Sequence, residues 1–204
     1  IKVLCPDVNE SFYKFAVNKK SEIRFGLGAI KGVGESAVNS IVEERKQNGI
    51  YKSFSDFVKR VDLRSCNKRT IESLVLSGGF DSFEIDRSRY FHVEDGQSYI
   101  EKMIKFGNKI QQDKSSTQMD IFGGAQEIEL ESPKAPICEK WKTMEFLSKE
   151  KEVVGIYLSA HPLDDFLFES SNFSNSVIKD IKLLEKNKSR DLFFSCVIVD
   201  VEHR

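Results

Sequence analysis

The residues best suited to chemistry lie in the segment IKGVGESA, residues 30–37. Two glycines separated by one residue let the backbone approach an anion closely and leave its N–H groups free. The helix expected directly after them adds the positive end of its dipole, and Lys31 supplies a cation beside it. The segment therefore predicts a phosphate-binding hairpin. A plain glycine turn between two helices is the alternative.

Nucleotide-binding loops fit this segment poorly. The stretch GLGAIKGVG lacks the Gly-Lys-Ser/Thr ending of a P-loop, and no β-branched strand immediately precedes it as in a dinucleotide-binding turn. The anion expected at the hairpin is therefore not a nucleotide held in either of these ways.

Three helices are predicted around the hairpin. The first runs from Gly34 to Gln47, because apolar residues recur at helical spacing and Gly49 follows as a stop signal. The second begins at Ser53, which forms a Ser-x-x-Asp capping box with Asp56. The third is capped by Asn67 and ends at Ser77-Gly78-Gly79, with a buried stripe expected at Ile71, Leu74 and Val75.

The flanking regions are less regular. Alternating apolar residues at 12–17 predict a strand or an edge hairpin, and the spacing after Phe83 remains helical in character. The polar, turn-rich stretch 111–136 predicts an exposed loop. Beyond it we expect a helix from Trp141 to Gly155, a second helix near Val177–Leu184 and a terminal strand over Leu192–Glu202.

Composition restricts the class of protein. The 204 residues carry 31 basic and 32 acidic side chains, a net charge of −1, and 40% of them are hydrophobic. Because no stretch approaches the roughly 18 apolar residues of a membrane span, we expect a cytoplasmic globular chain without membrane contacts. Four dispersed cysteines suggest neither a disulfide framework nor a zinc site. A start at Ile1 and an unpartnered last strand favour an internal part of a longer protein.

No catalytic or metal site is predicted. Ser159, His161 and Asp164 lie close together, but three neighbours on one short turn cannot readily present a nucleophile, a base and an orienting acid. His92 and His203 each stand alone, so metal binding has no support.

The segment 30–37 resembles the helix-hairpin-helix motif of DNA-binding proteins, which grips the duplex backbone without reading bases. The helix that starts at residues 67–69, followed by LVLSGGFDSF, resembles a second, degenerate copy. Basic residues outnumber acids between the two copies, as expected of a phosphate-facing surface. The resemblance implies a set of DNA-binding residues: Lys31, Gly32, Val33, Gly34, Ser36, Lys68 and Arg69.

Four ordered segments, FGLGAIKGVGESAV, VDLRSCNKRTIESLVLSGGFDSF, STQMDIFGG and EKEVVGIYLSAHPLD, together resemble the C-family bacterial replicative DNA polymerases. The resemblance implies a mainly α fold with a small β portion at the C-terminus. It places the end of the fingers at 1–25, a tandem helix-hairpin-helix domain at 26–83, a helical region with the exposed loop at 84–168, and the start of an OB-fold at 169–204.

The same resemblance gives the loop a role. Gln118, Met119, Asp120, Ile121 and Phe122 look like an internal peptide that binds the sliding clamp, the beta subunit of the replicase. Duplex DNA and other replicase subunits are the further partners implied. Nucleotidyl transfer and its magnesium ions would belong to a palm domain before Ile1, so no cofactor is expected here and this chain alone should be inactive.

Two other functions remain open at this stage. One is a DNA-binding or repair scaffold that is not a polymerase and carries the same hairpin module. The other is a hairpin-type DNA glycosylase, whose catalytic aspartate lies downstream of the hairpin, as Asp56 does here. Asp56 is already explained by its capping-box position, which makes the glycosylase the weaker of the two.

Overall fold

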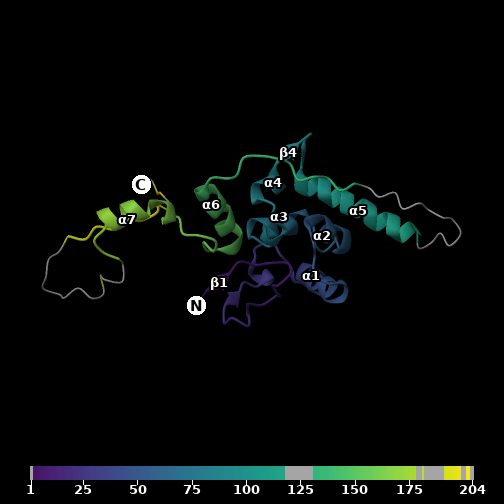
Figure 1. Cartoon of the computed structure of the whole chain (residues 1–204), viewed down its shortest axis with the longest axis horizontal. Coiled ribbons are helices and arrows are strands. Elements are labelled where there is room, and N and C mark those ends of the chain that lie inside the picture. Colours follow the sequence, from purple (N-terminus) through teal and green to yellow (C-terminus); the bar gives the residue numbers. More distant parts are fainter. Residues whose placement is uncertain (1, 118–130, 178–180, 182–190, 199–200, 203–204) are drawn as a thin grey trace. The chain divides into compact units, whose positions relative to one another are not determined.

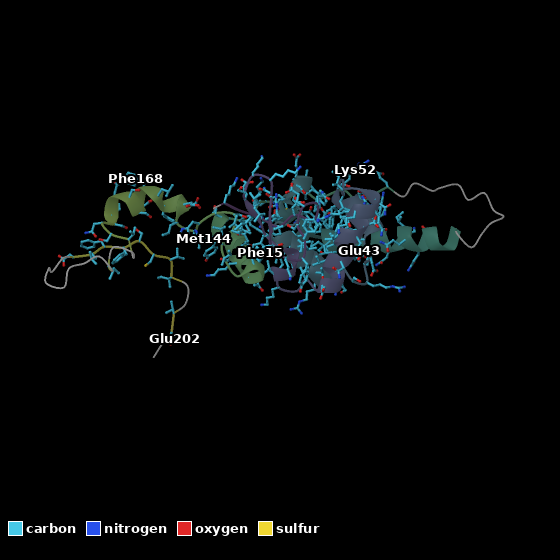
Figure 2. All side chains as sticks on the ribbon, turned by 90° about the horizontal axis from the view of Figure 1, so that it is seen from below. Phe15, Glu43, Lys52, Met144, Phe168 and Glu202 are labelled. Carbon is cyan, nitrogen blue, oxygen red and sulfur yellow. The ribbon has the colours of Figure 1, made fainter. Side chains whose placement is uncertain are left out.

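The computed structural model describes residues 2–117, 131–177, 181, 191–198 and 201–202 (Figure 1). They divide into two units, residues 1–158 and 159–204, each of which is described by itself. In the first unit the side chains crowd around a common interior, with Phe15 and Lys52 at its surface (Figure 2).

The first unit begins with a small three-stranded sheet of order β1-β3-β2. β1 (Val3–Leu4) pairs in parallel with β3 (Ile23–Arg24), and β2 (Ala16–Val17) pairs with β3 in antiparallel fashion. Of residues 12–17, for which the sequence predicts a strand or an edge hairpin, only Ala16–Val17 is a strand, and it lies at the edge of the sheet in a hairpin with β3. A short 3₁₀ turn, η1 (Leu27–Ala29), leads from β3 into the glycine segment.

The three helices predicted around the glycine segment are confirmed as α1 (Glu35–Asn48), α2 (Phe54–Arg60) and α3 (Lys68–Leu76). Ser53 accepts a hydrogen bond from the Asp56 N–H at 3.1 Å, and Asn67 accepts one from the Thr70 N–H at 3.1 Å. These are the caps that the sequence indicated. The predicted stripe of α3, Ile71, Leu74 and Val75, is buried.

The region after α3 differs from the prediction. It contains a 3₁₀ turn, η2 (Asp81–Phe83), the short helix α4 (Arg87–Phe91) and a hairpin of β4 (Val93–Glu94) with β5 (Gln97–Ser98). The two turn residues of this hairpin, Asp95 and Gly96, have φ of 55° and 74°, the left-handed conformation that an Asp-Gly hairpin turn requires.

The next helix, α5 (Tyr99–Thr117), is longer than predicted, so the expectation that a loop begins at residue 111 is wrong. Gln111, the first of the polar residues after Ile110, donates hydrogen bonds to the Val58 and Val61 carbonyls at the end of α2, and the helix continues beyond it to Thr117. Residues 131–142 then form an extended strap that leads to α6 (Thr143–Val154), and Gly155 ends α6 with a φ of 87°. The predicted helix at 141–155 is thus confirmed, two residues shorter at its start.

One core joins these elements, from Val8 near the N-terminus to Val153 in α6. Its centre is aromatic, with stacked, tilted or edge-to-face ring pairs at centroid distances of 4.9–6.3 Å among Phe54, Phe57, Phe80, Tyr90 and Tyr99. Such pairs add to the burial energy and hold the helices in fixed orientations.

The second unit contains a 3₁₀ turn, η3 (Asp164–Phe166), and α7 (Leu167–Phe173), from which Phe168 projects with 71% of its surface exposed (Figure 2). The strand predicted over Leu192–Glu202 is absent from residues 191–198 and 201–202. A strand needs a pairing partner, and Phe193 instead exchanges hydrogen bonds with the backbone N–H and the side-chain oxygen of Asn175. The helix predicted near Val177–Leu184 lies mostly outside the described residues.

The mainly α fold with a small β portion is confirmed, but in the described ranges the strands are β1–β3 and β4–β5, and none lies in residues 191–198 or 201–202. In the part of the chain that the structure describes, no helix is both long and apolar enough to cross a membrane.

Candidate nucleic-acid interface

The glycine segment forms an exposed turn on a buried anchor. Ile30 and Val33 are only 2% and 7% exposed and fix the turn to the core, whereas Lys31, Gly32 and Gly34 face solvent. Gly32 has a φ of 86°, which a side chain would strain. Val33, one of the predicted DNA-binding residues, thus contributes its side chain to packing.

The start of α1 presents unsatisfied backbone donors to solvent. Gly34 is the N-cap in an extended conformation, with φ of −81° and ψ of 160°, and offers no side-chain cap. Within the described ranges, the N–H groups of Gly34, Glu35 and Ser36 donate to no protein acceptor. Aligned N–H groups at the positive end of a helix dipole form an anion-binding site, and the exposed Ser36 hydroxyl lies beside them.

Helix α3 supports the turn from behind. The Thr70 hydroxyl donates to the Gly32 carbonyl at 3.2 Å, and a Cβ on Gly32 would lie 2.9 Å from the Ser73 hydroxyl. The Arg69 Nε is 3.7 Å from the same Cβ position, so this guanidinium lies against the turn. The structure therefore brings together two regions that are predicted to bind DNA, the turn and the start of α3.

The charges at this site are mixed but favour an anion. Lys31 and Arg69 are both exposed and form no ion pair with any described residue, while Glu35 in the first turn of α1 opposes an anion. The backbone N–H of Lys31 is not available, because it donates to the Val153 carbonyl of α6 at 2.8 Å. Lys31 can therefore act only through its ammonium group.

Lys68 differs from its neighbour Arg69, because acidic residues already engage it. Its ammonium lies 2.8 Å from Glu101 and 3.7 Å from Glu72. The hydrogen bond from Lys68, with a second from the Ser98 N–H, lowers the pKa of the Glu101 carboxyl to about 2. The structure thus places Lys68 in an intramolecular ion pair at the edge of the site.

Two other basic residues of this region are engaged by groups of the same chain. Arg45 is 8% exposed and donates to the Val8 carbonyl at 2.6 Å, and Arg60 forms ion pairs with Glu44 and Asp56. A count of charges along the sequence cannot separate such structural cations from free ones. The surface available to phosphates is therefore smaller than the count indicates.

The second glycine turn, at Gly78 and Gly79, is buried. The Gly79 carbonyl accepts a hydrogen bond from the Val8 N–H at 2.9 Å, and a Cβ on Gly78 would collide with the guanidinium of Arg87. That guanidinium bonds to Asp81 at 2.5 and 2.9 Å and to the fully buried Glu150 at 3.2 Å. The chain's own side chains thus fill the space in front of this turn.

The remaining chemical candidates have structural contacts. The Asp164 carboxylate accepts the backbone N–H of His161 at 2.7 Å, and His161 Nδ1 accepts that of Leu163 at 3.2 Å, so local hydrogen bonds stabilise this turn. Asp56 accepts the Lys52 N–H and pairs with Arg60. No group of three or more potential metal ligands occurs among the described residues. The peptide Gln118–Phe122 lies outside them.

Comparison with known proteins places these features in context. A family model described as a helix-hairpin-helix motif matches residues 1–90. The chain is 36% identical over 182 residues to DNA polymerase III subunit alpha of Pasteurella multocida, which covers 89% of this chain and 15% of that protein. The corresponding protein of Saccharopolyspora erythraea is 39% identical over 170 residues (80% of this chain, 14% of that protein), and that of Escherichia coli K12 is 32% identical over 190 (92% and 16%). The chain thus spans about one-sixth of these relatives.

Proposed function

Because this chain fits an internal segment of the DNA polymerase III alpha subunits, we propose that it holds duplex DNA and tethers a replicative polymerase to its sliding clamp. The observation that carries the first half of the proposal is the solvent-facing turn at Gly32–Gly34, with the free N–H groups of Gly34–Ser36 behind it and Lys31 and Arg69 beside it.

The DNA contact works through the phosphate backbone. Backbone N–H groups at the start of α1 bind a phosphate oxygen in a geometry that does not depend on the base, and the two cations add attraction that salt screens. Contacts of this kind position the duplex without reading its sequence. A polymerase that must advance over every sequence requires such a contact.

The clamp contact is assigned to Gln118–Phe122. Its Gln side chain offers polar contacts, and the adjacent Ile121 and Phe122 supply a small apolar anchor of the kind that dominates peptide recognition. Two weak contacts on one chain combine through effective concentration, so DNA and clamp together retain the polymerase far longer than either alone. Nucleotidyl transfer, with its magnesium ions, is assigned to the palm of the longer protein rather than to this chain.

The DNA half is tested by fluorescence titration of this chain with two duplexes of unrelated sequence. We expect equal affinities that fall about 10- to 40-fold between roughly 50 and 200 mM salt, as for two or three contacted phosphates. Affinity that differs strongly between the duplexes, or that ignores salt, would contradict backbone binding.

The clamp half is tested by titrating the same chain against the sliding clamp, together with a Gln118→Ala, Ile121→Ala, Phe122→Ala variant. A matched control replaces Ser115, Ser116 and Thr117 with Ala. We expect micromolar binding that the first variant loses and the control keeps. Duplex binding without any clamp binding would instead favour a general DNA-binding scaffold.

A further inference from the structure

Helix α6 holds one side of the exposed turn through its backbone. The N–H of Lys31, which directly precedes Gly32, donates to the Val153 carbonyl at 2.8 Å. That carbonyl is available because α6 ends at Val154, and the last carbonyls of a helix have no helical N–H partner. Helix α6 lies beyond residues 1–90, which match the helix-hairpin-helix motif, so this support is additional to the motif.

Helix α3 holds the other side of the same turn. The buried Thr70 donates its hydroxyl hydrogen to the Gly32 carbonyl at 3.2 Å. Two neighbouring backbone groups, the N–H of Lys31 and the carbonyl of Gly32, are thus bonded to two different helices. Helices α3 and α6 contact each other (Figure 1). The position of the turn therefore depends on how these two helices are held together.

Arg87 and Glu150 connect the two helices. Glu150 of α6 is fully buried, and its Oε1 accepts a hydrogen bond from Arg87 Nη1 at 3.2 Å. The same nitrogen donates to the carbonyl of Leu76, the last residue of α3, at 2.9 Å. The guanidinium also lies 4.4 Å from the ring centroid of Phe146 in α6. Glu150 Oε2 accepts the N–H of Leu158 at 2.8 Å, so both carboxylate oxygens hold the end of α6 in place.

We infer that α6 is part of the DNA-binding site and that Glu150 is its positioning residue. The contacts form a closed ring, from the turn through α3, Arg87, Glu150 and α6 back to the turn. Because Glu150 is fully buried, it acts through the Val153 carbonyl and not on DNA. Hydrogen bonds weaken steeply as their angles deteriorate, so a displaced turn presents its N–H groups poorly to a phosphate. The inference rests on the DNA half of the proposed function.

The experiment measures duplex affinity, its salt dependence and the amide hydrogen exchange of Lys31 and Leu158 in the full chain. The main variant is Glu150→Gln, in which an NH₂ group replaces one carboxylate oxygen and cannot accept from Arg87 or from the Leu158 N–H. Asp81→Asn is the charge control, because it also removes a carboxylate that pairs with Arg87 but lies outside α6. Urea unfolding of every variant gives the fraction folded during the titrations.

For Glu150→Gln we expect faster exchange of both amides and an affinity about three- to tenfold lower. The salt slope should not change, because every cation at the turn remains. Removing a negative charge would by itself strengthen binding to DNA, so a loss of affinity has the sign of positioning and not of charge. Asp81→Asn should leave the exchange of Lys31 unaltered and the affinity within about twofold of the unaltered chain.

A second variant decides the matter if Glu150→Gln does not fold. Glu150→Asp keeps the charge beside Arg87 but is one methylene shorter and cannot reach both donors, so we expect faster exchange of Lys31 and about a two- to threefold loss of affinity.

Three results overturn the inference: unchanged affinity in the folded Glu150 variant, unaltered exchange of Lys31 in it, or an equal loss of affinity in Asp81→Asn. If the unaltered chain does not bind duplex DNA, the DNA half of the proposed function fails, and the inference fails with it.

Discussion

The two glycine turns of this chain begin from similar sequence and reach opposite outcomes. At Gly32 the turn faces solvent, and at Gly78 it faces Arg87, Asp81 and the buried Glu150. Both glycines have a positive φ, 86° and 90°, which favours glycine at each position. The two turns differ in their surroundings: side chains of the same chain occupy the space in front of Gly78, whereas Gly32 is open to solvent.

The guanidinium of Arg87, which lies against Gly78, gives the second turn a role in stabilising the fold. Burial alone would lower the pKa of the Arg87 guanidinium, but its hydrogen bond to Asp81 and the charges of Asp81 and Glu150 raise it above its ordinary value. Arg87 therefore stays charged and links the turn to α6 through Glu150. Of the two turns, we therefore expect the first to bind a phosphate, whereas the second fixes the helices behind it.

The largest effect that separates the turns is expected for Gly78→Ala. The new Cβ would displace the Arg87–Asp81 pair in addition to straining a positive φ, a combined loss of about 3–5 kcal/mol in the free energy of unfolding. Gly49→Ala is the control for positive φ without an ion pair, since Gly49 has a φ of 84°, a ψ of 176° and open space around it, and should cost about 1–3 kcal/mol. Urea unfolding measures both. Equal losses would show that the ion pair at Gly78 contributes little.

Gly34→Asp should move stability and DNA binding in opposite directions. An aspartate at this uncapped N-cap would accept the free N–H groups of α1, raising stability by a few tenths of a kcal/mol. The same carboxylate would occupy the phosphate position and weaken duplex binding about 10- to 100-fold. Thermal unfolding and fluorescence titration measure the two effects.

Gly34→Asn separates capping from charge in that experiment. Asparagine caps the helix as aspartate does but adds no charge, so we expect a similar gain in stability and an intermediate loss of affinity. A Gly34→Asp variant that binds DNA as well as the unaltered chain would remove the start of α1 from the interface.

The adjacent cations Lys68 and Arg69 on α3 should differ in their contributions to duplex binding, by a smaller factor than the variants above. Arg69→Ala should weaken duplex binding about three- to tenfold and reduce the salt slope by about 1, because its guanidinium lies free beside Gly32. Lys68→Ala removes the same charge one residue away but should cost at most about twofold, because Glu101 and Glu72 already engage Lys68. The salt dependence of affinity distinguishes them. Equal slopes would mean that DNA draws Lys68 away from its acids.

Local signals predicted the helices well and the exposure of the turns poorly. Ser53 and Asn67 act through hydrogen bonds to residues three positions away, so their caps are visible in the sequence. The burial of Gly78 depends on Arg87 and on Glu150, which lie 63 residues apart. No local pattern encodes that contact, and a count of basic residues likewise could not identify Arg45 as an interior side chain.

The strands show the same difference between features that local sequence encodes and features that depend on distant residues. The Asp95-Gly96 dipeptide is a local signal for the hairpin of β4 and β5, and attention to it could have identified these strands. The apolar run at residues 192–198 satisfies every local preference for a strand, yet none forms, because pairing requires a neighbour that the sequence pattern cannot supply.

The smallest effect concerns Glu101, whose pKa reports whether Lys68 remains in its ion pair. A lowered folded-state pKa stabilises the fold above the unfolded value near 4.5, and that contribution is lost as pH falls toward about 2. An NMR titration of the Glu101 carboxyl should therefore give a midpoint near 2, and Lys68→Met should return it toward 4.5. Saturating duplex should leave the midpoint unchanged if Arg69 alone contacts DNA. A midpoint that rises on adding DNA would show that phosphate competes with Glu101 for Lys68, and would extend the interface from the first turn along α3.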